Sequence, residues 1–555
     1  MDILTIDAKD TETEGRRAAA QRAGRASMRP PTATGLAARV PAILLLLTWI
    51  LIPPACGGEA QTSAANLADQ VRAYRVAHEK TILAEFSSLL AIPNHASDVA
   101  HIRENASAIV RLLALRHIKA TLLESDGASP VVFGELAASG ATTTVTFYAH
   151  YDGQPVDAKA WSTDPFLPTL RTNSLDQGGQ RVDPAGVSGP FDPNWRLYAR
   201  SASDDKAPII GFLTALDALR ATGVAPSVNL KFFFEGEEEV GSPHLATILQ
   251  QYNQLLATDL WILCDGPIAQ TGQMQVFFGA RGVASLDVTV YGPNHGLHSG
   301  HYGNWAPNPI VLMTHLLDSM RDVDAQILIP GFYDDVRAAN SSERQTMLQN
   351  ATHDAELKRS LGIARTEGEP ASLAEQLLKP ALNVHGIQSG HVGVGTANVI
   401  ESEAQASIDF RLVPDQTPEH VRTLVEDHIA RQGYWIVHEP PGAQVRLEHA
   451  RIALLQWGRG AYSGARTSME LPVSHEVISV VEDTLRAEVV RVPTLGGSSP
   501  VYLFEGSRRK PVIGVPIANY DNNQHAANEN IRLGNLWAGI EIYAGLFANL
   551  GRARR

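Results

Sequence analysis

Cysteine is almost absent from this chain of 555 residues, which contains only Cys56 and Cys264. The sequence predicts that Cys56 is removed or modified, so Cys264 has no partner and no disulfide framework is expected. Cys264 stands in the apolar run LWILC. This setting favours a buried small hydrophobic residue over a reactive thiolate.

Basic charge is also scarce. Lysine and arginine together number 46 against 59 aspartates and glutamates, which gives a formal net charge of −13. No basic face emerges from the sequence, so nucleic acid is excluded as the main partner. A chain of this length exceeds one ordinary core, and two domains are the default expectation.

The apolar run AILLLLTWILI at 42–52 is too short to span a membrane comfortably. With Arg39 before it and PPACGGEAQTS after it, the run is typical of a secretory signal. Cys56 stands where a bacterial lipoprotein signal places its lipidated cysteine, and simple signal cleavage is the alternative. We therefore expect residues 1–60 to be a leader and spacer.

The same leader predicts where the protein resides. We expect export to the periplasm or cell envelope, with membrane attachment only through a lipid on Cys56. The stretch before Met28 is unusually long for the charged part of a signal, so both Met1 and Met28 are candidate starts.

Short apolar runs alternate with helical patterns after the leader. The runs TTTVTFYAH (142–150), VNLKFFFEG (228–236) and DLWILCDG (259–266) are separated by stretches such as APIIGFLTALDALRATG. This alternation predicts an α/β domain with a mostly parallel sheet. Active sites of such sheets lie at the carboxyl ends of the strands. The polar residues that follow these runs are His150, Glu238, Glu239 and Asp265.

A different texture begins after Arg281. ASLDVTVYG and AQASIDFRLVP alternate apolar and polar residues, as half-exposed strands do. The α/β texture returns from about Pro472. We therefore predict a smaller α+β domain at 282–466, inserted between two parts of the first domain at 66–281 and 467–552.

The acidic segment KFFFEGEEEVGS (231–242) runs from an apolar strand directly into four glutamates. Burying several ionised carboxylates is costly unless cations or hydrogen bonds compensate, which favours a metal site. An acidic helix start, stabilised by the helix dipole, explains the segment equally well on its own.

Four further motifs decide between these interpretations. YAHYDGQP (148–155), ARSASDDKAP (199–208), LCDGP (263–267) and NQHAANEN (523–530) also place histidine and carboxylates in loops. Nitrogen and oxygen ligands without thiolates suit a hydrolytic zinc or manganese site. Together the five motifs resemble the M20 family of metallopeptidases, and within it the carnosinase-like dipeptidases. The resemblance implies a zinc-exopeptidase-like catalytic domain with an inserted lid and dimerisation domain.

The resemblance also implies two divalent ions, zinc or alternatively manganese. The implied metal ligands are His150, Asp204, Glu239, Asp265 and His525, with Asp204 bridging both ions. Asp152 is expected to orient the imidazole of His150. Glu238 is expected to be the general base that takes a proton from a metal-bridged water.

The same family implies residues that contact the substrate. His298 in GLHSGHYGNWAPNP corresponds to a histidine that stabilises the oxyanion and, in dimeric members, comes from the other subunit. A guanidinium at Arg411 suits a substrate carboxylate. The further substrate-binding candidates are Asn398 in GTANVIES and an anion nest formed by Gly496, Gly497 and Ser498.

Several positions depart from the family pattern. Glycines of the family are replaced by Ala199, Ser201 and Ala207, and Glu401 stands where a proline is expected. All the implied ligands are nevertheless present.

We therefore expect a hydrolase of dipeptides or short peptides with a free C-terminal carboxylate, acting as a homodimer through the lid domain. An N-acyl amino acid amidohydrolase or carboxypeptidase of the same family is the alternative, because only the pocket would differ. A catalytically inactive peptide-binding lipoprotein is a third possibility. The intact pair Glu238 and Glu239 argues against it, since a binding protein has no need of the base.

Overall fold

The computed structural model describes residues 64–351, 354–506 and 510–552, and these belong to one compact unit at 61–555. The leader at 1–60, with Cys56 and both candidate starts, lies outside the described residues, so those predictions stay untested. Among the residues that are described, no helix combines the length and apolarity needed to cross a membrane.

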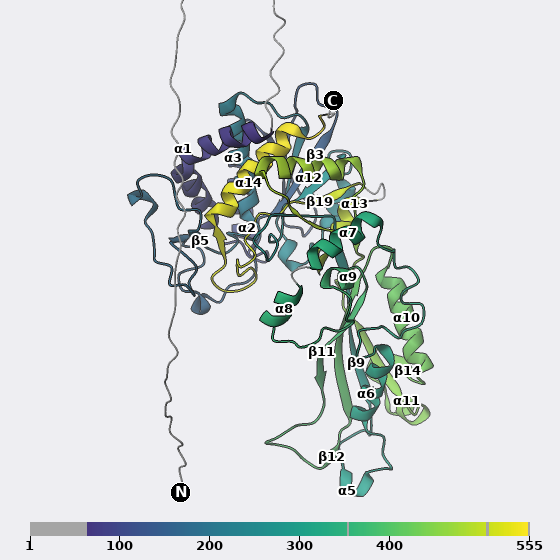
Figure 1. The fold of residues 1–555 in the computed structure, drawn as a ribbon. Helices are drawn as coiled ribbons and strands as arrows, with labels where there is room; N and C mark the ends of the chain where they lie inside the picture. The colour runs from purple at the N-terminus through teal and green to yellow at the C-terminus, as the bar shows by residue number, and fades with distance from the viewer. Residues whose placement is uncertain (1–63, 352–353, 507–509, 553–555) are drawn as a thin grey trace, which may run out of the picture. The chain divides into compact units, whose positions relative to one another are not determined.

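The first sheet has eight strands in the spatial order β1-β2-β6-β3-β7-β19-β8-β17. Figure 1 labels β3 and β19 of this sheet. In that order their bounds are Lys119–Leu123, Val131–Leu136, Asn229–Glu235, Thr144–His150, Leu260–Leu263, Val512–Gly514, Gln275–Phe277 and Val490–Val492. β3 pairs in parallel with both β6 and β7, and β7 with β19. Antiparallel pairs occur between β1 and β2, β2 and β6, and β19 and β8. The expected parallel arrangement therefore holds at the centre, where the motif-bearing strands lie.

Both faces of the first sheet are buried by helices. Phe232 and Phe234 belong to the core cluster beneath α1, α3 and α14, whereas Phe233 belongs to a second cluster with residues of α4 and α13. This alternation is the two-residue period of a strand, and it explains why KFFFE reads as continuously apolar. The helices on these faces are α1 (Ala64–Leu90), α2 (Val99–Leu115), α3 (Lys206–Thr222), α4 (Leu245–Gln251), α12 (Pro472–Leu485), α13 (Val501–Glu505) and α14 (Leu533–Asn549). Cys264 is buried in the first cluster, as predicted.

The second sheet has a separate core. Its main path runs β11-β13-β9-β15-β14, and β16 and β18 both pair with the beginning of β9. The bounds are Ala381–Gln388, Glu403–Leu412, Gly279–Tyr291, Ile452–Trp457, Trp435–Val437, Ala465–Arg466 and Leu495–Ser498. α6 (Pro309–Met320) and α10 (Pro418–Arg431) bury one face, where Met313 and Val425 meet Val288 and Ile408.

Smaller elements complete the described chain. β10 (Leu297–His298) pairs with β12 (Val399–Ile400), and β20 (Asn530–Arg532), β5 (Arg196–Tyr198) and β4 (Thr169–Arg171) form a three-stranded sheet. The remaining helices are α5 (Ser299–Tyr302), α7 (Ser341–Asn350), α8 (Asp354–Ser360), α9 (Leu373–Leu377) and α11 (Ala443–Glu448), with 3-10 turns η1 (Ala158–Ala160), η2 (Pro184–Gly186) and η3 (Glu238–Val240).

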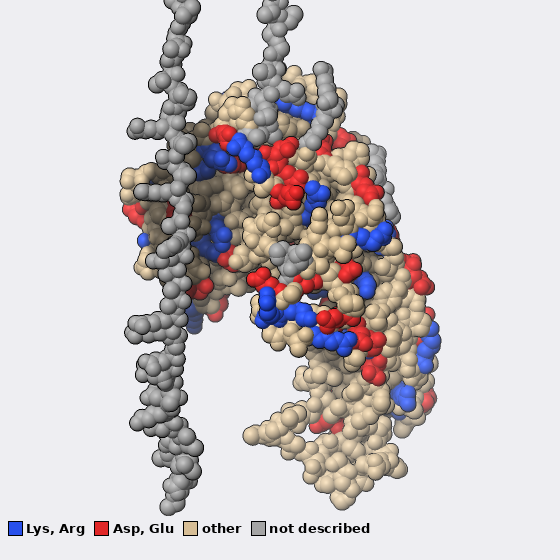
Figure 2. Space-filling model, viewed as in Figure 1, with Lys and Arg blue, Asp and Glu red and all other residues tan. Residues whose placement is uncertain are grey.

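The mixed α/β class agrees with the sequence prediction. The second sheet has its own core, and the division into domains at 66–281, 282–466 and 467–552 stays a prediction. On the face drawn in Figure 2, basic and acidic side chains are interspersed without a continuous basic patch.

Candidate metal centre

The candidate site is built at the carboxyl edge of the first sheet. His150 is the last residue of β3, and its register partner on β6 is Glu235. Asp265 follows β7, and Glu238 and Glu239 open the η3 turn after β6. Because β6, β3 and β7 are parallel, their carboxyl ends meet at one edge, as the sequence predicted.

Two loops bring the remaining candidate ligands to this edge. Asp204 lies between β5 and the start of α3 at Lys206. His525 lies in the segment between β19 and β20. Residues separated by more than 300 positions in the sequence therefore meet at one place.

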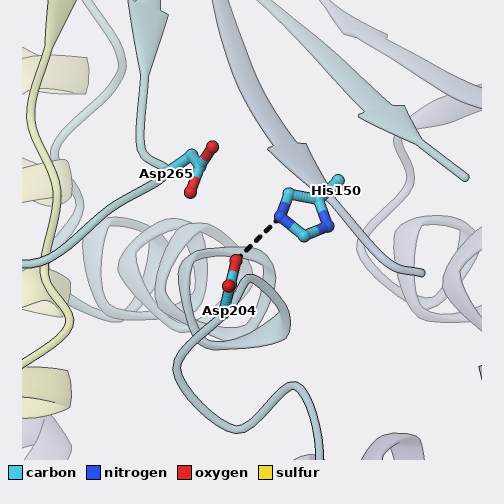
Figure 3. Close-up of side chains that lie close together, drawn as sticks. All are labelled: His150, Asp204 and Asp265. Carbon is cyan, nitrogen blue, oxygen red and sulfur yellow. Dashed lines mark hydrogen bonds and ion pairs between the residues drawn. The ribbon is translucent and has the colours of Figure 1, made fainter. Parts of the chain in front are cut away.

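The five predicted ligands form two groups that share Asp204. His150, Asp204 and Asp265 make the first group, and Asp204, Glu239 and His525 make the second. In each group the ligand atoms lie within 4.8 Å of one another. Figure 3 shows the first group converging, with His150 Nε2 2.9 Å from Asp204 Oδ1.

The other oxygen of Asp204 serves the second group. Asp204 Oδ2 and Glu239 Oε2 each lie 3.1 Å from His525 Nε2. Asp204 Oδ2 is buried, and its contact with His525 Nε2 does not have the geometry of a hydrogen bond. A buried carboxylate oxygen without a hydrogen bond, facing a nitrogen and a second carboxylate, fits a divalent ion held by nitrogen and oxygen ligands. The residues present therefore fit the metals that the family resemblance implies.

Electrostatics point in the same direction. Burial, followed by the charge of Asp204, raises the pKa of Asp265 to about 6. Burial also raises the pKa of Glu238 well above its usual range, although His150 opposes this shift. Contacts with Asp204 and Glu239 raise the pKa of His525 to about 10. Crowded carboxylates of this kind call for positive charge.

Asp152 is fully buried and contacts three parts of the site. Its Oδ1 lies 3.4 Å from His150 Nδ1, which fits the predicted orienting role. The same carboxylate accepts hydrogen bonds from the backbone nitrogens of Glu238 at 3.1 Å and Glu239 at 3.0 Å. One side chain therefore holds the imidazole and the turn that carries both glutamates.

The neighbouring acidic residues Glu235, Glu237 and Asp205 lie in other hydrogen-bond networks. Glu235 accepts a hydrogen bond from the Tyr148 hydroxyl at 2.9 Å. Glu237 accepts from the backbone nitrogens of Ser129 at 3.1 Å and His244 at 2.9 Å. Asp205 Oδ2 accepts from the backbone nitrogen of His150 at 3.3 Å.

The predicted carboxylate-binding residues gather at the beginning of β9. Arg411 Nη1 donates to Ser498 Oγ at 2.8 Å, and Ser498 Oγ donates to the carbonyl oxygen of Gly282 at 3.1 Å. Gly496 and Gly497 belong to β18, which pairs with β9. A Cβ added at Gly497 would meet open space, so β18 leaves room for a ligand beside this residue.

His298 and Asn398 lie elsewhere. Ser299 N donates to the carbonyl oxygen of Asn398 at 2.8 Å, and His298 pairs with Val399 across β10 and β12. This small sheet follows the end of β9, whose beginning pairs with β16 and β18. β9 has 13 residues, and at about 3.3 Å per residue it spans roughly 40 Å. Within one chain, His298 is therefore remote from the ligand groups.

Sequence reasoning missed four residues that contact this machinery. Gln154 Nε2 donates to Glu239 Oε2 at 2.8 Å, and Arg281 donates to the carbonyl oxygen of Gly496 through Nε at 3.0 Å and Nη2 at 2.9 Å. The Tyr462 side chain lies beside Ser498. Glu529 binds the loop that ends in Asp204. Gln154 and Glu529 lie inside two of the five motifs, YAHYDGQP and NQHAANEN, so the motifs could have identified them. Arg281 and Tyr462 lie outside the five motifs, and no local pattern in the sequence identifies them.

The α/β fold and the two converging ligand groups define a metal-dependent hydrolase. Residues 146–549 match Peptidase family M20/M25/M40. Because this match covers well over half of the sequence, the chain belongs to that peptidase family, and the predicted family is confirmed.

Individual relatives span most of the chain. The Cys-Gly metallodipeptidase of Schizosaccharomyces pombe is 27% identical over 421 residues, covering 75% of this chain and 81% of that protein. The Beta-Ala-His dipeptidase of Homo sapiens is 25% identical over 448 residues, covering 76% and 78%. The crystal structure of an M20 family metallo-carboxypeptidase from Sulfolobus solfataricus aligns with a TM-score of 0.66 at 27% identity, covering 84% of this chain and 98% of that one.

Proposed function

We propose that this protein is a two-metal dipeptidase that hydrolyses the amide bond of dipeptides or short peptides with a free C-terminal carboxylate. The observation that carries the proposal is the placement of Asp204 between two groups of nitrogen and oxygen ligands. The relatives named as Cys-Gly and Beta-Ala-His dipeptidases support a dipeptide as substrate.

His150, Asp204 and Asp265 would hold one divalent ion, and Asp204, Glu239 and His525 the other. When bound, such ions supply Lewis acidity that acidifies a water and polarises an amide carbonyl; we propose zinc, with manganese as the alternative. The His525 side chain is 55% exposed, which leaves the second group open to substrate from solvent.

Glu238 serves as the general base in this proposal. It accepts the proton of the attacking water and returns it to the leaving amine. The backbone bond from Glu238 N to Asp152 fixes the turn from which the carboxylate projects. The charges of His150, Asp265 and Asp204 act on the pKa of Glu238, which supports a base close to the first ligand group.

The substrate carboxylate is assigned to Arg411, Ser498 and the backbone of Gly496 and Gly497 in β18. A planar guanidinium can bind a carboxylate through two hydrogen bonds, and backbone NH groups can add to the attraction. Arg281 is a second cation here: burial, followed by the charge of Arg411, lowers its pKa to about 10, so it stays charged at neutral pH. Arg411 Nε donates to Asp409 Oδ2 at 3.0 Å. Two cations beside one carboxylate leave positive charge for an anionic ligand.

His298 acts from a second subunit in this proposal, and Asn398 accompanies it. The remoteness of His298 from the ligand groups of its own chain supports this assignment. The end of the second sheet also exposes apolar side chains, with Trp305 80% and Ile387 60% exposed, and Figure 2 shows few charged residues there. An exposed apolar surface of this kind favours association. The second-sheet domain would then serve as lid and dimerisation domain.

Export and lipid attachment at Cys56 complete the proposal, on the strength of the leader sequence alone. Mass spectrometry of the cell-associated protein tests it directly. A mature N-terminus at Cys56 carrying a lipid is expected, and an unmodified Cys56 within an intact leader would contradict it.

Hydrolysis of a substrate panel tests the proposed activity. Metal-free protein is reconstituted with zinc or manganese and offered dipeptides, N-acyl amino acids and longer peptides. Cleavage confined to dipeptides and short peptides, and lost when the substrate carboxylate is amidated, is expected.

A carboxypeptidase is the second candidate, favoured by the similarity to the Sulfolobus enzyme. Stepwise release of single residues from the C-terminus of long peptides would identify it. Wild-type protein that turns over none of the panel with either metal would refute the proposed activity.

A further inference from the structure

Glu529 is a fully buried carboxylate in the segment that also carries His525. Its Oε1 accepts hydrogen bonds from Ser203 N at 2.9 Å, Ser203 Oγ at 2.9 Å and Asp204 N at 3.0 Å. Its Oε2 accepts from Arg200 Nη1 at 2.8 Å and Ser201 N at 2.9 Å. Five donors from the loop at 200–204 therefore converge on one carboxylate.

This loop needs an external anchor because it holds a strained residue. Ser201 adopts a φ of 60°, a left-handed conformation that costs a non-glycine residue free energy. The family pattern has glycine here, whereas this chain has serine. The bond from Ser201 N to Glu529 helps to stabilise the left-handed turn.

The loop ends at the residue on which both ligand groups depend. Asp204 presents Oδ1 to His150 and Oδ2 to His525, at 2.9 Å and 3.1 Å. A small rotation of the Asp204 backbone would move both oxygens, and Glu529 holds the nitrogen of that backbone. Arg200 ties the two segments a second time, because its Nη2 donates to the carbonyl oxygen of Ala526 at 3.3 Å.

We propose that Glu529 is a positioning residue that fixes Asp204 against the His525 segment and thereby sets the affinity of the pair of metal sites. The inference rests on the proposed two-metal centre and deepens it. Glu529 touches neither substrate nor metal in this assignment, and it acts through the backbone of Asp204. Removing its charge should therefore weaken metal binding rather than only the stability of the fold.

Glu529→Gln tests the assignment with little change in shape. The amide nitrogen of glutamine cannot accept a hydrogen bond, so at least two of the five loop donors lose their acceptor. Metal-free wild type and variant are titrated with zinc by calorimetry or against a chromophoric chelator. Wild type is expected to bind two ions, and the variant to bind at least one of them about tenfold to a hundredfold more weakly, as for other residues that support metal ligands.

Glu541→Gln is the matched control. Glu541 is also buried and paired with arginine, since Arg72 Nη2 donates to it at 2.7 Å, but it lies in α14 and its ion-pair partners, Arg72 and Arg75, lie in α1. Both variants are expected to unfold at lower temperature, whereas only Glu529→Gln should shift the zinc isotherm. An unshifted isotherm for Glu529→Gln, or an equal shift for Glu541→Gln, overturns the inference.

Ser203→Ala keeps the test decisive if Glu529→Gln does not fold. It removes one side-chain donor and leaves the buried charge in place. Zinc affinity should fall roughly threefold to tenfold, the worth of one hydrogen bond. Unchanged affinity would count against the inference. Wild type that binds fewer than two ions would refute the two-metal centre itself. This result differs from variants that bind two ions with wild-type affinity, which would overturn only the role of Glu529.

Discussion

Asp152 shows how much a single buried side chain can organise. Its two oxygens hold the backbone nitrogens of Glu238 and Glu239, and Oδ1 also lies 3.4 Å from His150 Nδ1. The family resemblance predicted only the last of these contacts. The two hydrogen bonds from Glu238 N and Glu239 N join the segment after β3 to the turn after β6. The proposed base and one candidate ligand from each group, His150 and Glu239, therefore all contact Asp152.

At this scale, the role of Glu238 leads to a direct prediction. Glu238→Gln should lower kcat by about 10²–10⁴-fold, the usual contribution of a general base, because the amide cannot accept the proton of the attacking water. Metal content should stay at the wild-type value, since Glu238 is outside both ligand groups. Turnover is measured with a dipeptide, and metal by elemental analysis of the same preparation. Wild-type kcat in the variant would remove Glu238 from the proposed role.

Tyr462 gives a second prediction at the scale of the residue. Its side chain lies beside Ser498, and burial followed by the charge of Glu238 raises the pKa of Tyr462 to about 12. It therefore stays protonated and able to donate near the proposed carboxylate site. Tyr462→Phe should raise KM for free-carboxylate dipeptides roughly threefold to tenfold, with a smaller effect on kcat.

Tyr502→Phe is the matched control, because its ring stacks 5.9 Å from that of Tyr462. It should leave KM close to the wild-type value. If both variants change KM equally, ring packing rather than the Tyr462 hydroxyl explains the effect.

Elements position these residues through close packing at strand ends. β6 continues into Gly236, and Tyr151 N donates to the carbonyl oxygen of Glu235 at 2.8 Å. A Cβ at Gly236 would overlap the hydroxyl of Tyr151. The Tyr151 side chain is fully buried, and its hydroxyl donates to the carbonyl oxygen of Pro130. Glycine is therefore needed for β3 and β6 to end side by side.

Gly236→Ala should lower the free energy of unfolding by about 1–3 kcal/mol, the usual result of overpacking a filled core. Urea denaturation measures this change. Gly186→Ala is the control, because a Cβ there meets nothing within 4 Å. Equal stability of the two variants would show that Tyr151 relaxes without cost.

Two large sheets organise the described part of the chain, and the proposed substrate site draws on both. Arg411 lies on β13 of the second sheet, whereas the ligand groups lie at the edge of the first. His298 lies about a strand length away from the beginning of β9. In the proposed mechanism it therefore acts from a second subunit.

Mixing two inactive variants tests this arrangement. Glu238→Gln and His298→Ala homodimers should each be nearly inactive, and subunit exchange should restore about a quarter of wild-type activity, because each mixed dimer has one intact site. Dipeptide turnover before and after exchange is the measurement, with light scattering to establish the dimer. No recovery in a demonstrated mixed dimer would show that His298 does not act across the interface.

The sequence by itself determined the family, the strand ends and the identity of the five candidate ligands. These follow from local order: an apolar run followed by polar residues marks a strand end, and the motifs carry the resemblance. Only the tertiary structure decided that Asp204 faces both histidines, that Asp152 supports the Glu238 turn and that Arg281, Tyr462 and Glu529 belong to the machinery. Those contacts join segments separated by as many as several hundred residues, and their geometry depends on how both sheets pack, which no local pattern encodes.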